Sequence, residues 1–403
     1  MAGADTTGTD RARDVRSLRE RRLETLRRTG AADRHRIALA PPTRTFYWIL
    51  TIVATFVVLG LVMVLSSSSV VGIQNGGSAW GMFIKQSMWA VLGLFTLWFA
   101  YNTPYDTWVK PRWLRIAATV IVGANVAVIG AGVVVNGATA WLDIGPIRLQ
   151  PSEFMKIVAI LFAANLIARR HRSVHIGELV HYPLLGVMGL TALICILQRD
   201  FGGALIFMGV LLMMMTMSGM KVKRLLATVG LVGLAGWMML QFSTRANLRL
   251  MAFLNLEETK NDFGYQVWQA ILSMANGGWT GTGIGSGTSK WGYVPEAHTD
   301  FIFAVIAEEM GLVGTVLVIG GFALLVLFGT QVALGAPDMT GALIAGGVTA
   351  WFGFQAFVNI GGVVGAMPLT GLTLPFLSYG GSSLIATMTA AGLLLNVARH
   401  VKS

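Results

Sequence analysis

Long apolar runs dominate this chain and restrict what it can fold into. Of its 403 residues, 54% are hydrophobic and only 12% are charged, roughly half the charged fraction of an ordinary soluble domain. Runs of about twenty apolar residues match the length of a helix that crosses the hydrocarbon layer. The spans must be helices, because hydrocarbon offers backbone polar groups no water to bond. The sequence therefore predicts an all-α integral membrane protein.

Ten apolar segments are separated by polar or glycine-rich connections, and we expect each to form one transmembrane helix. They cover about 46–65, 82–100, 115–135, 152–168, 183–197, 201–218, 225–243, 301–330, 341–362 and 376–397. The fifth and sixth are short, and the eighth is long enough to tilt or to extend beyond the bilayer. The prediction is a membrane domain over 46–398, between a basic tail, 1–45, expected to be disordered, and a short tail, 399–403.

Positive charge gathers in the amino-terminal tail and in alternate connections. The Lys and Arg residues of those connections follow the second, fourth, sixth and tenth segments: Lys110, Arg112, Arg115, Arg169, Arg170, Arg172, Lys221, Lys223, Arg224, Arg399 and Lys402. The positive-inside rule then predicts that both termini are cytoplasmic and that 244–300 is one large extracytoplasmic loop. Residues 265–274 have helical spacing there, and we expect them at the membrane interface.

The net charge of +11 raises the question of nucleic acid as a partner. No module of aromatic and basic residues accompanies the charge, so we expect no nucleic-acid binding. Membrane lipids are the partner that a basic tail beside the membrane favours. The chain has one cysteine, Cys195, which excludes an intramolecular disulfide.

An acidic residue, Asp300, lies where the long loop meets the eighth apolar segment, in the run Pro-Glu-Ala-His-Thr-Asp-Phe-Ile-Phe-Ala at 295–304. Its position alone leaves two interpretations equally open. One is a helix N-cap, and the other is a functional carboxylate acting as a general base. The titratable neighbours Glu296 and His298 favour a polar site. Glu308 and Glu309 lie deeper, where each would need a partner that the sequence does not identify.

Charged residues also gather at the start of the fourth segment, where Glu153 and Lys156 share one helix face and Arg148 lies just ahead. A structural ion pair between Glu153 and Lys156 and a cationic clamp for a phosphate both fit this pattern. The net positive charge of the three mildly favours the clamp.

Each of two further groups of charges has a structural interpretation and a functional one. Arg199 and Asp200 connect the fifth and sixth segments and suit either a hydrated turn or a polar site. Arg245 and Arg249 lie four residues apart at the start of the long loop, where they repel each other unless something anionic lies opposite. Lipid headgroups would satisfy them.

The run Leu-Pro-Phe-Leu-Ser-Tyr-Gly-Gly-Ser-Ser at 374–383 precedes the tenth segment. Its small residues favour close helix contact, the common use of such runs in membranes. A wall of hydroxyl groups facing a ligand, with Ser378 among them, is the alternative.

Together, the runs at 295–304 and 374–383 resemble the SEDS family (shape, elongation, division and sporulation proteins) over 46–398. Gln150–Lys156, Gly264–Gln266 and the ten-segment layout add to the resemblance, and Leu65–Ser69 with Ile306–Gly311 favour its cell-division branch over its elongation branch. Two positions depart from the family pattern: Arg199 and Leu256 stand where proline is usual. Both departures concern local backbone shape.

The resemblance implies a peptidoglycan glycosyltransferase that polymerises lipid II into β-1,4 glycan strands outside the cytoplasmic membrane, at the division septum. It places the catalytic base on Asp300. The residues expected to bind substrate are Arg148, Glu153, Lys156, Asp200, Glu296, His298 and Ser378. The implied partners are a class B penicillin-binding transpeptidase and other division proteins. No organic cofactor is expected, and a divalent cation such as Mg²⁺ or Mn²⁺ stays open. A lipid II flippase and a non-catalytic division scaffold are the alternatives.

Overall fold

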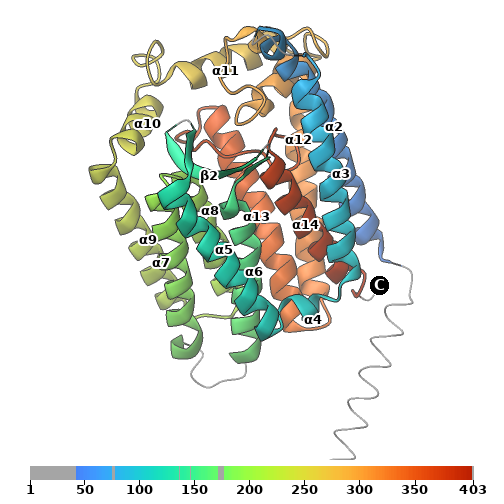
Figure 1. The fold of residues 1–403 in the computed structure, drawn as a ribbon, viewed down its shortest axis with the longest axis vertical. Helices are drawn as coiled ribbons and strands as arrows, with labels where there is room; N and C mark the ends of the chain where they lie inside the picture. The colour runs from blue at the N-terminus through green and yellow to red at the C-terminus, as the bar shows by residue number, and fades with distance from the viewer. Residues whose placement is uncertain (1–41, 75–77, 136, 146, 171–176, 402–403) are drawn as a thin grey trace, which may run out of the picture.

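The computed structural model describes residues 42–74, 78–135, 137–145, 147–170 and 177–401. In these ranges the chain forms a bundle of long helices, with short helices and a small sheet gathered at one end (Figure 1). The tail predicted to be disordered, 1–45, lies outside the described residues as far as 41, and residues 402–403 of the carboxyl-terminal tail do so too.

The long apolar helices follow the predicted segments. They are α2 (Arg44–Gln74), α3 (Gly81–Asn102), α5 (Pro111–Ala131), α6 (Pro151–Arg170), α7 (Tyr182–Leu197), α8 (Phe201–Met217), α9 (Val222–Phe242), α12 (Ile302–Gly335), α13 (Met339–Val363) and α14 (Gly381–Ala398). A π-helical turn, Gly177–His181, precedes α7. Among the described residues nine helical spans are long and apolar enough to cross a membrane, and α8 is a shorter apolar helix of 17 residues. The prediction of about ten membrane helices in a helical membrane protein is confirmed.

Shorter elements occupy the connections. Helix α4 (Tyr105–Trp108) joins α3 to α5. The predicted outer loop, 244–300, contains α10 (Thr244–Leu254), α11 (Tyr265–Gly277) and a 3₁₀ turn, Ser289–Trp291. Residues 265–274, predicted to be helical, lie in α11. In Figure 1, α10 and α11 lie at the end of the bundle away from α4, and we call their end the loop end.

A small antiparallel sheet at the loop end is not predicted by the sequence. Strands β1 (Val133–Val135), β2 (Ala138–Ile144) and β3 (Ile147–Leu149) pair in the order β1-β2-β3. The expected third span, 115–135, ends early at Ala131 because the apolar run of valines continues as a strand. The amide N–H of Thr139 donates to the carbonyl of Gln198, so the sheet is held beside the connection between α7 and α8.

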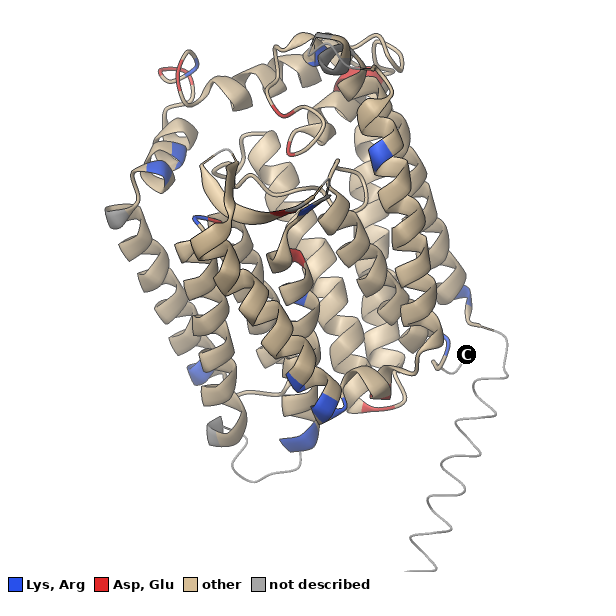
Figure 2. Cartoon of the chain, in the orientation of Figure 1, with Lys and Arg blue, Asp and Glu red and all other residues tan. Residues whose placement is uncertain are grey.

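The two ends of the membrane domain meet at the other end of the bundle. The ring of Tyr101 lies 5.8 Å from the ring of Phe46, near the start of α2, and the Arg399 guanidinium lies 4.9 Å from the same ring. Figure 2 shows a group of Lys and Arg residues at this end, and others at the loop end. The described parts of both tails therefore leave the bundle together, as the positive-inside pattern requires. Which side of the membrane this end faces stays a prediction.

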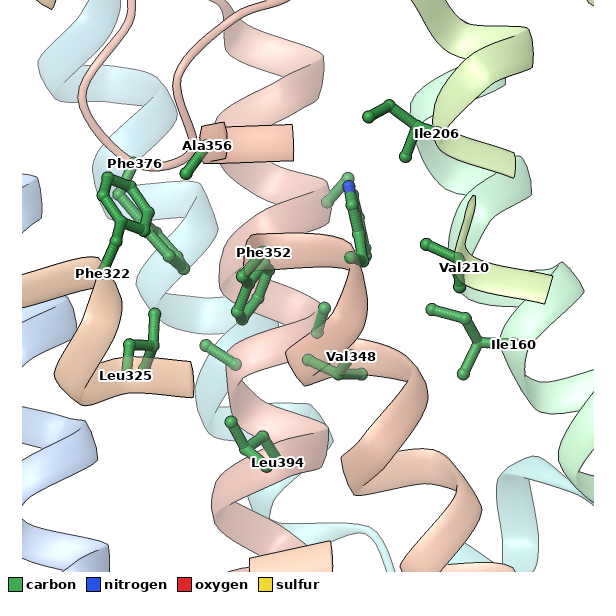
Figure 3. Packing of buried hydrophobic residues seen from close by; sticks show 14 of the residues in the cluster. Ile160, Ile206, Val210, Phe322, Leu325, Val348, Phe352, Ala356, Phe376 and Leu394 are labelled. Atoms are coloured by element: carbon green, nitrogen blue, oxygen red, sulfur yellow. The ribbon is translucent and has the colours of Figure 1, made fainter. Parts of the chain in front are cut away.

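Helix α13 lies at the centre of the core. It packs against α6, α8, α12 and α14, and Figure 3 shows Phe352 and Val348 of α13 among side chains from these neighbours. Phe376, from the segment before α14, packs edge-to-face on Phe352 with ring centroids 5.0 Å apart. The tenth helix therefore begins at Gly381 rather than at 376, because Phe376 turns back into the core at φ 66°.

Helix α12 breaks at Gly311, whose φ of 64° and ψ of −156° are not helical. The glycine-rich segment 278–287, after α11, runs beside this break. Its amide groups donate to two carbonyls that the break leaves without a partner in the helix: Thr282 N to Glu308 O at 2.9 Å and Gly283 N to Glu309 O at 3.0 Å. A methyl group at Gly281 would lie 2.1 Å from the Glu309 carbonyl oxygen. The glycine-rich segment thus replaces hydrogen bonds that the helix loses at its break.

Candidate active site

Asp300 lies at the loop end, two residues before α12. The helix is preceded by Phe301 as its cap residue, and no side-chain hydrogen bond caps it, so the N-cap interpretation of Asp300 is wrong. The backbone carbonyl of Asp300 accepts a hydrogen bond from Asn359 Nδ2 of α13 at 2.9 Å. Within the described part of the chain, the Asp300 carboxylate receives no hydrogen bond. The backbone is anchored while the carboxylate stays available.

The two sequence runs that carry the family resemblance lie against each other. Ser378 Oγ donates to the Thr299 carbonyl at 2.6 Å and accepts from the Leu374 amide at 2.8 Å. The Tyr379 amide donates to the His298 carbonyl at 2.9 Å. Ser378 is buried, and its hydroxyl therefore joins the two segments in this structure. Its predicted contact with substrate stays a prediction.

Arg249 of α10 faces the same region. Its Nη1 donates to the Thr370 carbonyl at 2.9 Å. Gly371, next in the chain, has φ 74°, and a methyl group there would lie 3.2 Å from Arg249 Nη2 and 3.4 Å from Asp300 Oδ2. The guanidinium and the carboxylate therefore border the space that a side chain at position 371 would occupy. We call it the space above Gly371. Arg249 is not among the residues predicted to form the site, although its spacing from Arg245 favours an anionic partner.

Asp200 also lies near this cluster. Its Oδ1 accepts a hydrogen bond from the Gly203 amide at 2.8 Å and caps α8. Burial raises the pKa of Asp200, and the hydrogen bond from Gly203 opposes that shift. Arg199 precedes it with φ 58°, a value that proline cannot adopt. The departure from the family pattern at this position therefore coincides with a different backbone path.

The surroundings of Asp300 raise the pKa of its carboxyl group strongly. Burial and then the charge of Glu296 raise the pKa of Asp300 to about 7, while Arg249 opposes the shift and Asp200 adds to it. Burial lowers the pKa of His298, with the charge of Glu296 opposing. Asp300 therefore titrates near neutrality, where a general base works best, and His298 is neutral there.

Glu153 and Lys156 form an ion pair in the interior, with Lys156 Nζ 2.8 Å from Glu153 Oε1. The two residues are only 5% and 3% exposed. Lys156 also donates to Gln355 Oε1 at 3.0 Å and lies 5.0 Å from the Trp351 ring centroid. The structure therefore contains the ion pair that the sequence suggested. The predicted contact of Glu153 and Lys156 with substrate stays a prediction. Gln355 in turn donates to the Thr373 carbonyl, which connects the ion pair to the segment beside Asp300.

Arg148 lies on β3 and pairs with Asp143 of β2, with 2.8 Å between Arg148 Nε and Asp143 Oδ1. Both side chains are exposed. The Gln150 amide donates to Ser382 Oγ at the start of α14. The strand therefore ends beside the segment 374–383, on the same side of the bundle as Asp300.

Glu308 and Glu309 have the partners that the sequence did not identify. Glu308 accepts hydrogen bonds from the amides of Thr288 and Ser289 at 2.8 and 3.0 Å. Glu309 accepts from Ser66 Oγ at 2.5 Å and from the Gly285 amide at 3.1 Å. Both carboxylates bind the glycine-rich segment and fix it against α12, so they support the loop rather than the space above Gly371.

The described residues contain no group of three or more His, Cys, Asp or Glu side chains placed to hold a metal ion. The side chains near Asp300 therefore do not fit a metal site built by the protein alone. The divalent cation that the sequence left open stays a prediction.

Comparisons with known proteins identify the family of this chain. A family model for FtsW, RodA and SpoVE, described as cell cycle protein, matches residues 46–403. Stage V sporulation protein E of Bacillus subtilis is 34% identical over 87% of this chain and 97% of its own length. A probable peptidoglycan glycosyltransferase FtsW of Geobacter sp. (strain M18) is 35% identical over 85% of this chain and 94% of its own length.

Solved structures show the same architecture. The crystal structure of the rod shape determining protein RodA from Thermus thermophilus matches with a TM-score of 0.65 and 28% identity, over 88% of this chain and 97% of that one. A chain of a peptidoglycan synthase complex that coordinates polymerization and crosslinking matches with a TM-score of 0.70 and 29% identity, over the same shares. The resemblance to SEDS proteins is confirmed: this chain belongs to the FtsW/RodA/SpoVE family of cell cycle proteins.

Proposed function

We propose that this peptidoglycan glycosyltransferase polymerises lipid II at the outer face of the cytoplasmic membrane, with Asp300 as the general base. The observation that carries the proposal is that the Asp300 carboxylate accepts no hydrogen bond within the described residues. A pKa raised to about 7 agrees with a role as general base. Burying a carboxylate without a partner is costly. Such a group is a candidate for catalysis when it lies beside other titratable groups, as Asp300 does beside Glu296 and Asp200.

The proposed reaction begins with the transfer of one proton from the acceptor sugar to Asp300. Asp300 takes the proton from the 4-hydroxyl of the acceptor sugar as that oxygen attacks the anomeric carbon of the donor. The new carbon–oxygen bond forms while the bond to the diphosphate breaks, and the diphosphate leaves with the electron pair. Attack from the opposite face converts an α-linked donor to a β-1,4 product. The donor's diphosphate bond supplies the driving force, so no nucleotide is consumed.

The cellular setting is part of the same proposal. Several FtsW proteins among the relatives are named as probable peptidoglycan glycosyltransferases, which favours a role in septal cell-wall synthesis. The related synthase complex joins polymerization to crosslinking. We infer a crosslinking partner for this chain, a class B penicillin-binding transpeptidase, together with other division proteins.

The test uses the purified full chain with its transpeptidase partner and labelled lipid II. Wild type is expected to make long glycan strands. Asp300→Asn, which keeps the shape and removes the base, is expected to reduce the rate by about 100-fold or more. Asp262→Asn changes an exposed aspartate of the same loop and is expected to leave the rate unchanged. Equal strand formation by Asp300→Asn and wild type would remove Asp300 from its role. A wild type that makes no strands but moves lipid II across vesicles would favour the flippase.

A further inference from the structure

Arg249 is a cation whose bonding capacity is largely unused. A guanidinium carries five N–H donors, and the described contacts of Arg249 use one of them, on the Thr370 carbonyl. No carboxylate of the described residues lies within ion-pair distance of it, and Asp300 is not paired with it. Burial lowers the pKa of Arg249, but an arginine stays charged in proteins. A half-buried charge with free donors suits an anionic ligand.

The free donors of Arg249 face the space above Gly371. Because Gly371 has no side chain, the point where a methyl group would stand lies 3.2 Å from Arg249 Nη2 and 3.4 Å from Asp300 Oδ2. Gly371 itself is exposed, so a ligand can reach this space from outside the protein. One small volume thus offers hydrogen-bond donors on one border and a proton acceptor on another.

Three other cations near the site are already engaged, and Arg199 is exposed on the connection before α8. Lys156 is buried against Glu153, Gln355 and the Trp351 ring. Arg148 pairs with Asp143 at 2.8 Å. Arg245, one turn from Arg249 on α10, points to the β1–β2 turn, where a methyl group at Gly137 would lie 2.7 Å from its Nη1. Arg249 is therefore the cation that shares a border with Asp300.

We propose that Arg249 binds the diphosphate of the polyprenyl-linked donor on its own border of the space above Gly371, across that space from the base Asp300. This inference rests on the proposed function and names the residue that holds its leaving group. The leaving diphosphate gains negative charge as the sugar bond breaks, so a guanidinium held there by α10 and Thr370 stabilises the transition state more than the ground state. A planar guanidinium also matches the paired oxygens of a phosphate. Lys156 then serves as a structural residue rather than as the clamp.

The test separates binding from turnover. The full-length protein in detergent is titrated with a long-chain polyprenyl diphosphate, and in parallel with the polyprenyl monophosphate, inorganic pyrophosphate and phosphatidylglycerol. Wild type is expected to bind the polyprenyl diphosphate most tightly. Arg249→Gln is expected to weaken that binding by about 10- to 100-fold. Arg249→Lys keeps the charge without the planar fork and is expected to fall between the two. Arg245→Gln removes the same charge one turn away and is expected to stay within about twofold of wild type.

Several outcomes would overturn the inference. One is unchanged polyprenyl diphosphate binding in Arg249→Gln. Another is an equal loss for phosphatidylglycerol, which would make Arg249 a general headgroup contact. If Arg249→Gln does not fold, judged by thermal unfolding, Arg249→Lys decides: its inhibition by added polyprenyl diphosphate during strand synthesis must weaken relative to wild type. The proposed function fails separately, when wild type makes no strands; this inference fails when wild type makes strands and the Arg249 variants bind like wild type.

Discussion

The rate of strand synthesis should depend on pH through Asp300. Because the pKa of Asp300 is raised to about 7, roughly one tenth of the protein carries the basic carboxylate at pH 6 and roughly nine tenths at pH 8. The rate is therefore expected to rise about tenfold between these values and then to level off. An aspartate at its ordinary pKa would give a flat profile over the same range.

A single substitution should move this profile in a known direction. Burial is the largest cause of the raised pKa, and the charge of Glu296 is the second. Glu296→Gln removes that charge, which makes the ionised form of Asp300 less costly and lowers its pKa. The whole shift spans about three units and burial holds the larger share, so we expect the midpoint to fall by about one unit, equivalent to about 1.4 kcal/mol. His298 adds no opposing charge because its pKa is itself lowered.

The assay measures initial rates of strand formation from pH 5.5 to 9, with the crosslinking site of the partner blocked. Glu257→Gln removes an exposed carboxylate from the same loop and serves as the matched control, with no expected change of midpoint. A Glu296→Gln midpoint at or above that of wild type would refute the electrostatic reasoning, and so would a flat wild-type profile.

Stability supplies a second readout with the opposite sign. A carboxyl group whose pKa is raised in the folded state stabilises the fold below its unfolded pKa, and this contribution is lost as pH rises through about 7. Asp300→Asn, which cannot ionise, should therefore be more stable than wild type by roughly 2–4 kcal/mol at pH 8 and by much less at pH 5. Thermal unfolding in detergent at both pH values checks this. An Asp300→Asn protein less stable than wild type at pH 8 would contradict the raised pKa.

Three substitutions test the framework around the site by thermal unfolding. Glu308→Gln leaves a poorer acceptor for the Thr288 and Ser289 amides and should destabilise the fold by about 1.5–3 kcal/mol. Arg199→Gly relieves a positive φ of 58° and should stabilise by about 1 kcal/mol. Gly277→Ala would place a methyl group 2.0 Å from the Ala307 carbonyl oxygen and should destabilise by about 1–3 kcal/mol. A change in the free energy of unfolding with the opposite sign would contradict the hydrogen bonds, the backbone strain or the close contact described for that residue.

The helices could be predicted from the sequence because each apolar run is long enough to need burial in lipid. Their ends could be predicted less well where an apolar run also suits another structure. Val133–Val135 continues the apolar run of α5, and hydropathy does not separate a strand from another half turn of helix. Residues 376–380 are apolar or small too, yet Phe376 turns into the core, which depends on the position of Phe352 in α13.

The site could be predicted in part. The runs 295–304 and 374–383 were singled out separately, but the hydrogen bonds that join them, such as Ser378 Oγ to the Thr299 carbonyl, link residues 79 positions apart. The ion pair between Glu153 and Lys156 could be predicted from their helical spacing. The hydrogen bond from Lys156 to Gln355 could not, because it depends on where α13 packs. From the sequence, Arg249 could be identified only as one of two like charges four residues apart. Its place beside Asp300 depends on a hydrogen bond to Thr370, 121 positions further along the chain.

A comparison of two carboxylates, Asp300 just before α12 and Glu308 in its second turn, supports the proposal that Asp300 is the general base. Glu308 is fully buried and receives hydrogen bonds from Thr288, Ser289 and Asn276, which compensate the desolvation of its charge. Asp300, eight residues earlier, receives none among the described residues. A sequence selected only for stability would place a neutral residue there, because a partly buried carboxylate without hydrogen bonds lowers stability at neutral pH. The same lack of donors keeps its proton affinity near neutrality, which is the property that a general base needs.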